Sequence, residues 1–365
     1  MWREKYLFYL TLIFIGGNLI TQWLTKGASP LFSAICCTSA LIGIITLSII
    51  TITNKKSNLH LFIPLFFLLG ILNSSQGLLL GKFTFLEEAS GGEFIQGLRS
   101  MFSNRLAMVI PPEEGTANSL LKALAMGDKG DLPQSIKISY RLSGAMHLLA
   151  LSGLHVGYIY GGLKLALGIF PKFGKWGILK SLIIMALLGF YAIFTGASQS
   201  ICRAVLMAFI YETGTLTGRE KHGLNSLSIS ALTICCIDPS APAGISFQLS
   251  YCAMLGIFLI QPHLERAISE ISSNKRIRKI WNTIGISISC QLATLPLTLF
   301  YFDSFPLVSL LTNLITMPVV TTVMTLAPFA IVTVGIPWIG PLASVLLTYT
   351  IELLNLMMEI LSRIV

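Results

Sequence analysis

The chain is a series of long apolar segments separated by short polar ones. A helix that crosses a bilayer needs about 20 mostly apolar residues, and such segments recur along almost the whole sequence. Pro318 and Pro328 allow the segment 306–334 to be one kinked helix or two broken ones. The predicted membrane-spanning segments are 6–24, 31–53, 60–80, 148–170, 178–196, 201–217, 223–237, 244–262, 281–302, 306–334 and 341–362.

One long polar stretch, residues 81–147, interrupts this pattern. Apolar residues at helical spacing predict an amphipathic helix over 94–110 that ends at Pro111. A second helix is expected over 116–126 with Gly127 as its C-terminal cap, and a third from after Pro133 toward Tyr140. Such helices either lie on the outer leaflet or over a mouth between spans, or else pack on the helix bundle.

Composition supports a membrane protein. Hydrophobic residues make up 54% of the 365 residues and charged residues 11%, whereas soluble domains carry about 25% charged residues. That fraction leaves too little polar surface for a soluble particle. The fold class expected is therefore all-α, a polytopic integral membrane protein with about 10–11 transmembrane helices plus outer amphipathic helices.

The basic residues predict the orientation of the chain. Lys and Arg accumulate in cytoplasmic loops, and the basic loops fall on one side if all of the first eight spans are real. They place the N-terminus in the cytoplasm, and residues 81–147 outside. The net charge of +9 then reflects membrane orientation, not nucleic-acid binding. The residues used are Arg3, Lys5, Lys55, Lys56, Lys172, Lys175, Lys180, Arg219, Lys221, Arg266, Lys275, Arg276, Arg278 and Lys279.

Polar groups inside spans are costly and are candidates for function. They gather around residues 143–157, around 195–204, at the outer end of the eighth span, and within the ninth and tenth spans. Most lie in the outer half of the membrane by the predicted topology, as expected for a polar vestibule open to the outside or for several unrelated hydrogen bonds. The candidates are His147, Ser152, Gly153, His155, Arg203, Gln248, Ser250, Gln291 and Asn313.

The same residues give little support for metal or covalent chemistry. His147 and His155 are eight residues apart, unlike the i,i+4 pair of H-E-x-x-H, and no nearby Cys or carboxylate completes a site. Ser152 does not stand in a G-x-S-x-G motif. The seven cysteines lie in apolar segments without a C-x-x-C pair, which indicates buried hydrophobes. We expect no catalytic residue, metal or cofactor.

Five motifs together resemble one known family, the ComEC competence channels. They occur in the order seen in that family, followed by Asn313 and Pro318. The motifs are AMGDK at 125–129, HLLALSGLHVG at 147–157, TGASQSICRAVLM at 195–207, SFQLSYCAMLGI at 246–257 and SCQLATLPLTLFYF at 289–302.

The resemblance implies passage of single-stranded DNA across the bacterial inner membrane during natural transformation. Family members carry an outward OB-like domain near the N-terminus, and many carry a C-terminal metallo-β-lactamase-like domain. Here the stretch 81–93 is too short for the first, and no H-x-H-x-D zinc motif is present, so strand degradation is not expected. A natural short form, a fragment and a degenerate copy all remain open.

The expected organisation has four parts: an N-terminal membrane unit at 1–80, an outward amphipathic segment at 81–147, a ComEC-type core at 148–340 and a C-terminal span at 341–365. The expected partners are single-stranded DNA, membrane lipid, an outer DNA receptor, a cytoplasmic motor or DNA-protecting protein, and further copies of the chain. Two alternatives are a secondary transporter for a small solute and an intramembrane hydrolase built on Ser152 and a histidine.

Overall fold

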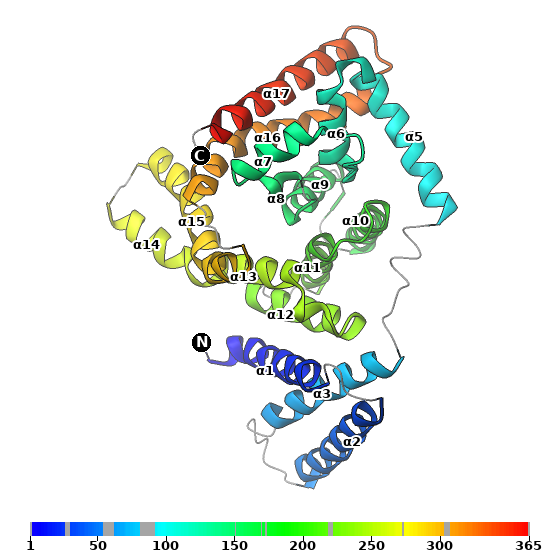
Figure 1. Ribbon diagram of the computed structural model, residues 1–365, viewed down its shortest axis with the longest axis vertical. Helices are drawn as coiled ribbons and strands as arrows, with labels where there is room; N and C mark the ends of the chain where they lie inside the picture. Colours follow the sequence, from blue (N-terminus) through cyan, green and yellow to red (C-terminus); the bar gives the residue numbers. More distant parts are fainter. Residues whose placement is uncertain are drawn as a thin grey trace. The chain divides into compact units, whose positions relative to one another are not determined.

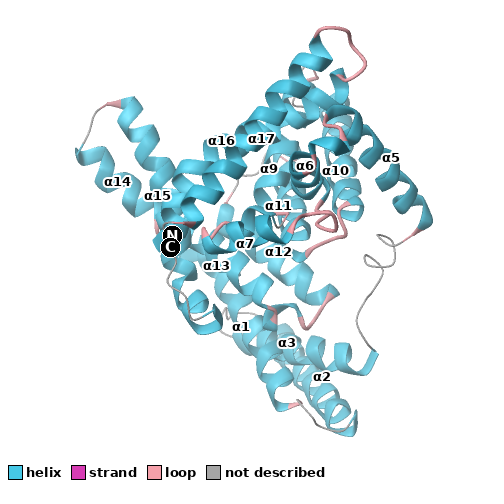
Figure 2. Cartoon of the chain, turned by 45° about the horizontal axis from the view of Figure 1, so that its top comes forward, coloured by secondary structure: helices cyan, strands magenta, loops and turns pink. Residues whose placement is uncertain are grey.

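The computed structural model describes residues 2–25, 30–53, 62–80, 92–149, 151–168, 170–171, 174–217, 222–271, 274–302 and 307–363. Within these ranges the chain forms helices and turns but no strand (Figures 1 and 2), so the all-α prediction is confirmed. Lys55, Lys56, Lys172, Arg219 and Lys221, which contribute to the topology prediction, lie outside the described residues.

The helices keep the labels of Figure 1. They are α1 (Trp2–Leu24), α2 (Pro30–Thr53), α3 (Phe62–Leu80), α5 (Glu93–Val109), α6 (Thr116–Met126), α7 (Gln134–Leu142), α8 (Met146–Leu149), α9 (Gly153–Ala166), α10 (Gly174–Phe194), α11 (Gln199–Leu216), α12 (Gly223–Ile237), α13 (Ile245–Leu259), α14 (Gln261–Ile271), α15 (Lys275–Phe302), α16 (Leu307–Thr333) and α17 (Ile339–Ser362).

Six segments in the described part of the chain are long and apolar enough to cross a membrane. They are Tyr6–Leu24, Gly174–Phe194, Ile245–Glu270, Trp281–Tyr301, Ile315–Thr333 and Ile339–Ser362. Three shorter apolar helices, Ser33–Thr46, Phe62–Gln76 and Gly223–Ile237, lie within the predicted second, third and seventh spans.

The structure settles the form of one predicted span and corrects that of another. The segment 306–334 is a single helix, α16, with Pro318 and Pro328 inside it. The segment 148–170 is not one helix, because α8 ends at Leu149 and α9 begins at Gly153. An apolar run shows that the side chains are compatible with lipid. It does not show whether the helix is continuous, because continuity depends on where caps replace the backbone hydrogen bonds of the helix.

The chain packs into two compact units. Unit 1 comprises Met1–Phe85 and Leu206–Met254, and unit 2 comprises Leu86–Val205 and Leu255–Val365. Both α11 and α13 contribute residues to each unit. This division describes packing, and the four-part organisation expected from the sequence stays a prediction.

In unit 1, α3 packs against α1 and α2, and α12 packs against α1. Glycines allow the helices to approach closely. A Cβ added to Gly17 would meet the backbone carbonyl of Phe67, and one added to Gly70 would meet that of Phe14. The Asn73 amide donates to the Cys235 carbonyl at 2.7 Å, which satisfies one of the carbonyls that the end of α12 leaves without a helical partner.

In unit 2, the paired helices α16 and α17 form a platform for the shorter helices. Helices α5, α6 and α7 pack on α17, and their buried side chains merge with those of α16 and α17 into one core. The three short helices match the predicted elements, and Gly127 ends α6 in the left-handed conformation with φ 75°. Of the two interpretations, these helices do pack on the bundle; their outward position stays a prediction.

Helices α13, α14 and α15 also form close contacts. Within unit 2, a Cβ added to Gly256 of α13 would meet the Ser289 carbonyl of α15. The Ser289 hydroxyl donates to the Gln261 side-chain oxygen at 3.3 Å, and the Gln261 amide donates to the Asn282 carbonyl at 3.3 Å. The fourth and fifth motifs therefore pack against each other through a glycine and a serine.

Candidate functional site

The turn between α10 and α11 is built by the residues Thr195–Gly196–Ala197. The Ala197 amide donates to the Ala192 carbonyl at 2.7 Å and the Gly196 amide to the Ile193 carbonyl at 3.1 Å. With Gly196 at φ 89°, this is a Schellman C-cap, which needs a left-handed residue. The turn stops α10 and directs the chain into a new helix that carries Arg203 in its second turn.

Helix α5 holds this turn in place. The Arg99 Nε donates to the Phe194 carbonyl at 2.7 Å, and a Cβ added to Gly196 would lie 3.6 Å from the Arg99 guanidinium. Phe102 also packs edge-on against Phe194, with ring centroids 5.5 Å apart. A cation at the C-terminal end of a helix complements the helix dipole, so Arg99 of α5 stabilises the end of α10.

A second turn of the same kind joins α7 to α8. The Ala145 amide donates to the Tyr140 carbonyl at 2.8 Å and the Gly144 amide to the Arg141 carbonyl at 3.0 Å, with Gly144 at φ 71°. The Thr312 hydroxyl of α16 donates to the Ser143 carbonyl at 2.7 Å. Burial in this core raises the pKa of the Tyr140 phenol. His147 belongs to α8, but its side chain lies outside the described residues.

Helix α9 begins with a capping box formed by Ser152 and His155. The Ser152 hydroxyl accepts from the Leu154 amide at 3.3 Å, and the His155 Nδ1 accepts from the Ser152 amide at 3.1 Å. His155 is 3% exposed, and its Nε2 has no hydrogen-bond partner in the described part of the chain. Because Nδ1 accepts a hydrogen bond, Nε2 carries the proton of the neutral ring.

The start of α9 packs against α11 at Arg203. A Cβ added to Gly153 would lie 3.5 Å from both the Arg203 Nη2 and the Ala204 Cβ. Arg203 is 6% exposed, and its Nη2 donates to the Ser200 hydroxyl at 3.4 Å. The absence of a side chain at Gly153 therefore leaves room for a buried guanidinium beside the N-terminal end of a helix, two features that both attract an anion.

His155 flanks the same helix start from another side. It lies two residues after Gly153, which is about 200° around the helix. Ser152, Gly153, His155 and Arg203 are therefore brought into one region, but the imidazole and the guanidinium do not stand on one face of α9.

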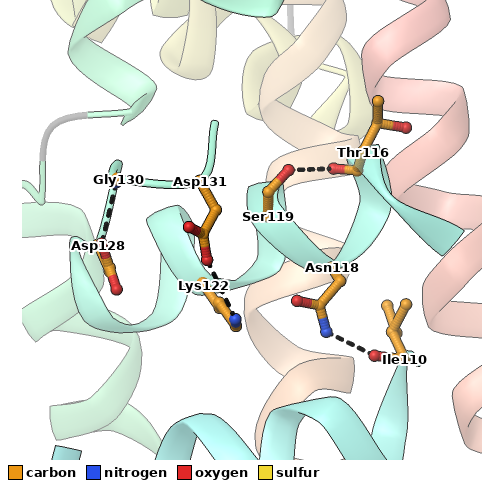
Figure 3. A network of polar contacts seen from close by, with 8 residues as sticks. All are labelled: Ile110, Thr116, Asn118, Ser119, Lys122, Asp128, Gly130 and Asp131. Atoms are coloured by element: carbon orange, nitrogen blue, oxygen red, sulfur yellow. Dashed lines mark hydrogen bonds and ion pairs between the residues drawn. The ribbon is translucent and has the colours of Figure 1, made fainter. Parts of the chain in front are cut away.

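The AMGDK motif packs against the break between α8 and α9. Gly127, which ends α6, lies so near Leu151 that an added Cβ would be 2.6 Å from the leucine side chain. Around it, the Gly130 amide donates to Asp128 at 3.0 Å, and Lys122 pairs with Asp131 at 3.4 Å (Figure 3). Three motif segments that are far apart in the sequence thus meet at residues 151–153.

Four predicted site residues belong to other helices. In unit 2, Gln291 belongs to α15 and Asn313 to α16, and each has one buried side-chain amide atom without a partner among the described residues. In unit 1, the Gln248 amide donates to the Pro242 carbonyl at 3.0 Å, and Ser250 lies on the same helix, α13. A single vestibule formed by all nine residues stays a prediction.

Three carboxylates inside predicted spans are absent from the candidate residues. Glu212 of α11 is 2% exposed, and Glu352 and Glu359 of α17 are exposed. The signal was present, because an acidic residue inside an apolar run is as costly in lipid as a basic one. Among the residues that the structure describes, no three His, Cys, Asp or Glu side chains gather as metal ligands do.

Comparisons with known proteins agree with the motif positions. The family described as competence protein matches residues 124–365, and no solved structure matches the chain. The chain is 27% identical to ComE operon protein 3 of Bacillus subtilis over 224 residues, to the uncharacterized protein YcaI of Escherichia coli over 212 and to Recombination protein 2 of Haemophilus influenzae over 243.

These matches cover only part of each relative. The three alignments include 60%, 56% and 62% of this chain but 26%, 27% and 30% of the respective relatives. The family match includes all five motif segments, and it extends through α17. The chain therefore belongs to the ComEC family of competence proteins and is a multi-pass helical membrane protein.

Proposed function

We propose that the chain forms the membrane core of a channel that passes single-stranded DNA through the bacterial inner membrane during natural transformation, with its N-terminus in the cytoplasm. The observation that carries this proposal is the interrupted fourth span, where α9 begins beside the buried Arg203. Irregular backbone at membrane depth is tolerated where it is buried in protein or lines a water-filled cavity. The positive end of the helix dipole and a guanidinium then suit passing phosphates.

The role proposed for this chain is conduction without enzymatic activity. A partner on the outer side would deliver DNA, and a cytoplasmic motor or DNA-protecting protein would draw the strand inward. Arg203 and the positive N-terminal end of α9 supply electrostatic attraction for the DNA backbone, which is independent of base sequence. Further copies of the chain are also proposed partners.

The proposal is tested by complementing a naturally transformable strain that lacks its own competence channel. We expect cells that make the chain to accumulate DNase-resistant, single-stranded labelled DNA, and cells with an empty vector to accumulate none. Immunoblots of the membrane fraction confirm that the chain is present. Absence of internalised DNA at normal membrane abundance, while the strain's own channel restores uptake from the same vector, would contradict a channel role.

One contact favours the alternative of an intramembrane hydrolase. The Ser152 hydroxyl lies 3.1 Å from the His155 Nδ1, as in a nucleophile–base pair. However, the Ser152 amide already donates to the same Nδ1, and the capping box accounts for both contacts. We expect a fluorophosphonate probe to leave Ser152 unmodified in the folded protein. Covalent labelling that disappears in Ser152→Ala would establish the hydrolase instead.

A further inference from the structure

Helix α17 carries a line of polar residues along one edge. They follow one another at intervals of four, four, three and four positions and therefore stay within about 80° of the helix circumference over about 22 Å. Residues on the neighbouring exposed face are apolar, and Leu342, Leu346 and Leu353 are 61%, 48% and 48% exposed. We call this line the α17 polar stripe. It consists of Ser344, Thr348, Glu352, Asn355 and Glu359.

The stripe runs through a helix of membrane-spanning length. The candidate span Ile339–Ser362 contains all five residues, and Glu352 lies near its middle. Glu359 pairs with Arg363 at 2.5 Å near the helix end. In contrast, Glu352 is exposed on the surface of unit 2, and no described residue forms an ion pair with it. Among the described residues, none neutralises this charge at mid-span.

Contact with lipid does not account for this arrangement. A carboxylate in hydrocarbon is strongly disfavoured, and ionisable residues inside membranes face a protein interior or a water-filled cavity. The Oδ1 of Asn355, one turn from Glu352, is buried and also has no hydrogen-bond partner in the described part of the chain. The apolar leucine face beside the stripe is the surface of α17 that suits lipid.

We propose that the α17 polar stripe lines a water-filled path through the membrane and that Glu352 makes this path selective for hydrated cations. Water in this path hydrates the Glu352 carboxylate. The negative charge attracts cations and repels anions, so phosphate groups would not bind here as they would beside Arg203. The inference rests on the membrane-spanning character of α17 and is independent of the DNA-transport proposal.

The test measures cysteine accessibility at positions of similar depth. Glu352→Cys and Thr348→Cys represent the stripe, and Leu353→Cys, about 100° away around the helix, is the matched control on the leucine face. Each full-length variant in membrane vesicles is treated with a membrane-impermeant methanethiosulfonate. Modification is read by mass spectrometry on the α17 peptide, which contains no native cysteine. We expect both stripe positions to react about tenfold faster than the control.

The charge of Glu352 is tested in the Thr348→Cys background. We expect a cationic trimethylammonium reagent to react faster than an anionic sulfonate reagent, and Glu352→Gln to lower this rate ratio by about tenfold, because one charge acts across a single helical turn. Equal rates at Glu352→Cys and Leu353→Cys would overturn the water-filled path. An unchanged rate ratio in Glu352→Gln would overturn its cation selectivity. Size-exclusion profiles in detergent confirm that each variant is folded.

Discussion

Two helix contacts in this protein depend on glycine but have different consequences. In unit 1, Gly17 and Gly70 bring α1 and α3 so close that an added methyl group would strike a backbone carbonyl. In unit 2, a methyl group added to Gly153 would make ordinary contacts at 3.5 Å with the Arg203 guanidinium and with Ala204. The first contact joins backbone to backbone, and the second leaves room for a charged side chain.

This difference distinguishes close packing of two backbones from a contact that admits a charged side chain. Small residues at helix interfaces usually increase van der Waals packing, which describes the α1/α3 contact well. At the α9/α11 contact the neighbour of the glycine is a cation that is 6% exposed. Substitutions should therefore affect stability most in unit 1 and DNA uptake most in unit 2.

The largest effect is expected from Arg203. Arg203→Ala should abolish DNA uptake, because the charge beside the start of α9 is lost. Arg203→Lys should restore part of it, because the charge survives without the planar donor geometry. The measurement is transformation frequency normalised to folded protein in the membrane. Uptake at the wild-type level by Arg203→Ala, at equal abundance, would remove this residue from the DNA path. The contact at Gly153 would then be a packing contact, like the contact between α1 and α3.

The next largest effect is expected from a bulky residue at position 153. Gly153→Leu should displace the guanidinium and strongly reduce uptake, whereas Gly153→Ala should keep most of it because its Cβ finds ordinary contact distances. Gly157→Leu, four residues further along α9, is the matched control, since nothing lies within 4 Å of its added Cβ. Similar uptake by Gly153→Leu and Gly157→Leu would show that room for Arg203 is not what Gly153 provides.

A smaller effect, on stability alone, is expected at the α1/α3 contact. Gly70→Ala should lower the free energy of unfolding by about 1–3 kcal/mol, as for other overpacked sites. Gly16→Ala in α1 is the control, because its added Cβ meets nothing within 4 Å and alanine favours the helix. Thermal unfolding of both variants in detergent gives the comparison. Equal unfolding temperatures for the two variants would show that α1 and α3 move apart to accept the added methyl group with little loss of stability.

Much of the helical framework could be predicted from the sequence. The amphipathic pattern over 94–110 predicts α5, and Gly127 is the cap that ends α6. These predictions succeed because hydrophobic spacing and glycine caps are local properties, which act within a few residues. The order of five motifs likewise indicated the family to which the chain belongs.

The same reasoning predicted the candidate site only in part. The sequence placed Ser152, Gly153, His155 and Arg203 at similar depth, and the structure brings them to one region. It did not indicate that the apolar run 148–170 is interrupted, because a capping box formed by Ser152 and His155 resembles any polar pair in a helix. The sequence shows Glu352 inside an apolar run, but only the packing of α17 shows that its side chain lies on the exposed surface of unit 2.

The sequence by itself determined an all-α membrane protein, the approximate positions of its helices and its membership of a motif family, because these depend on composition, period and order along the chain. Only the tertiary structure decided that Gly127 meets Leu151, that Gly153 faces Arg203 and that Arg99 binds the end of α10. Those contacts join residues that are 24, 50 and 95 positions apart. Their positions depend on how separate helices pack, which no local pattern records.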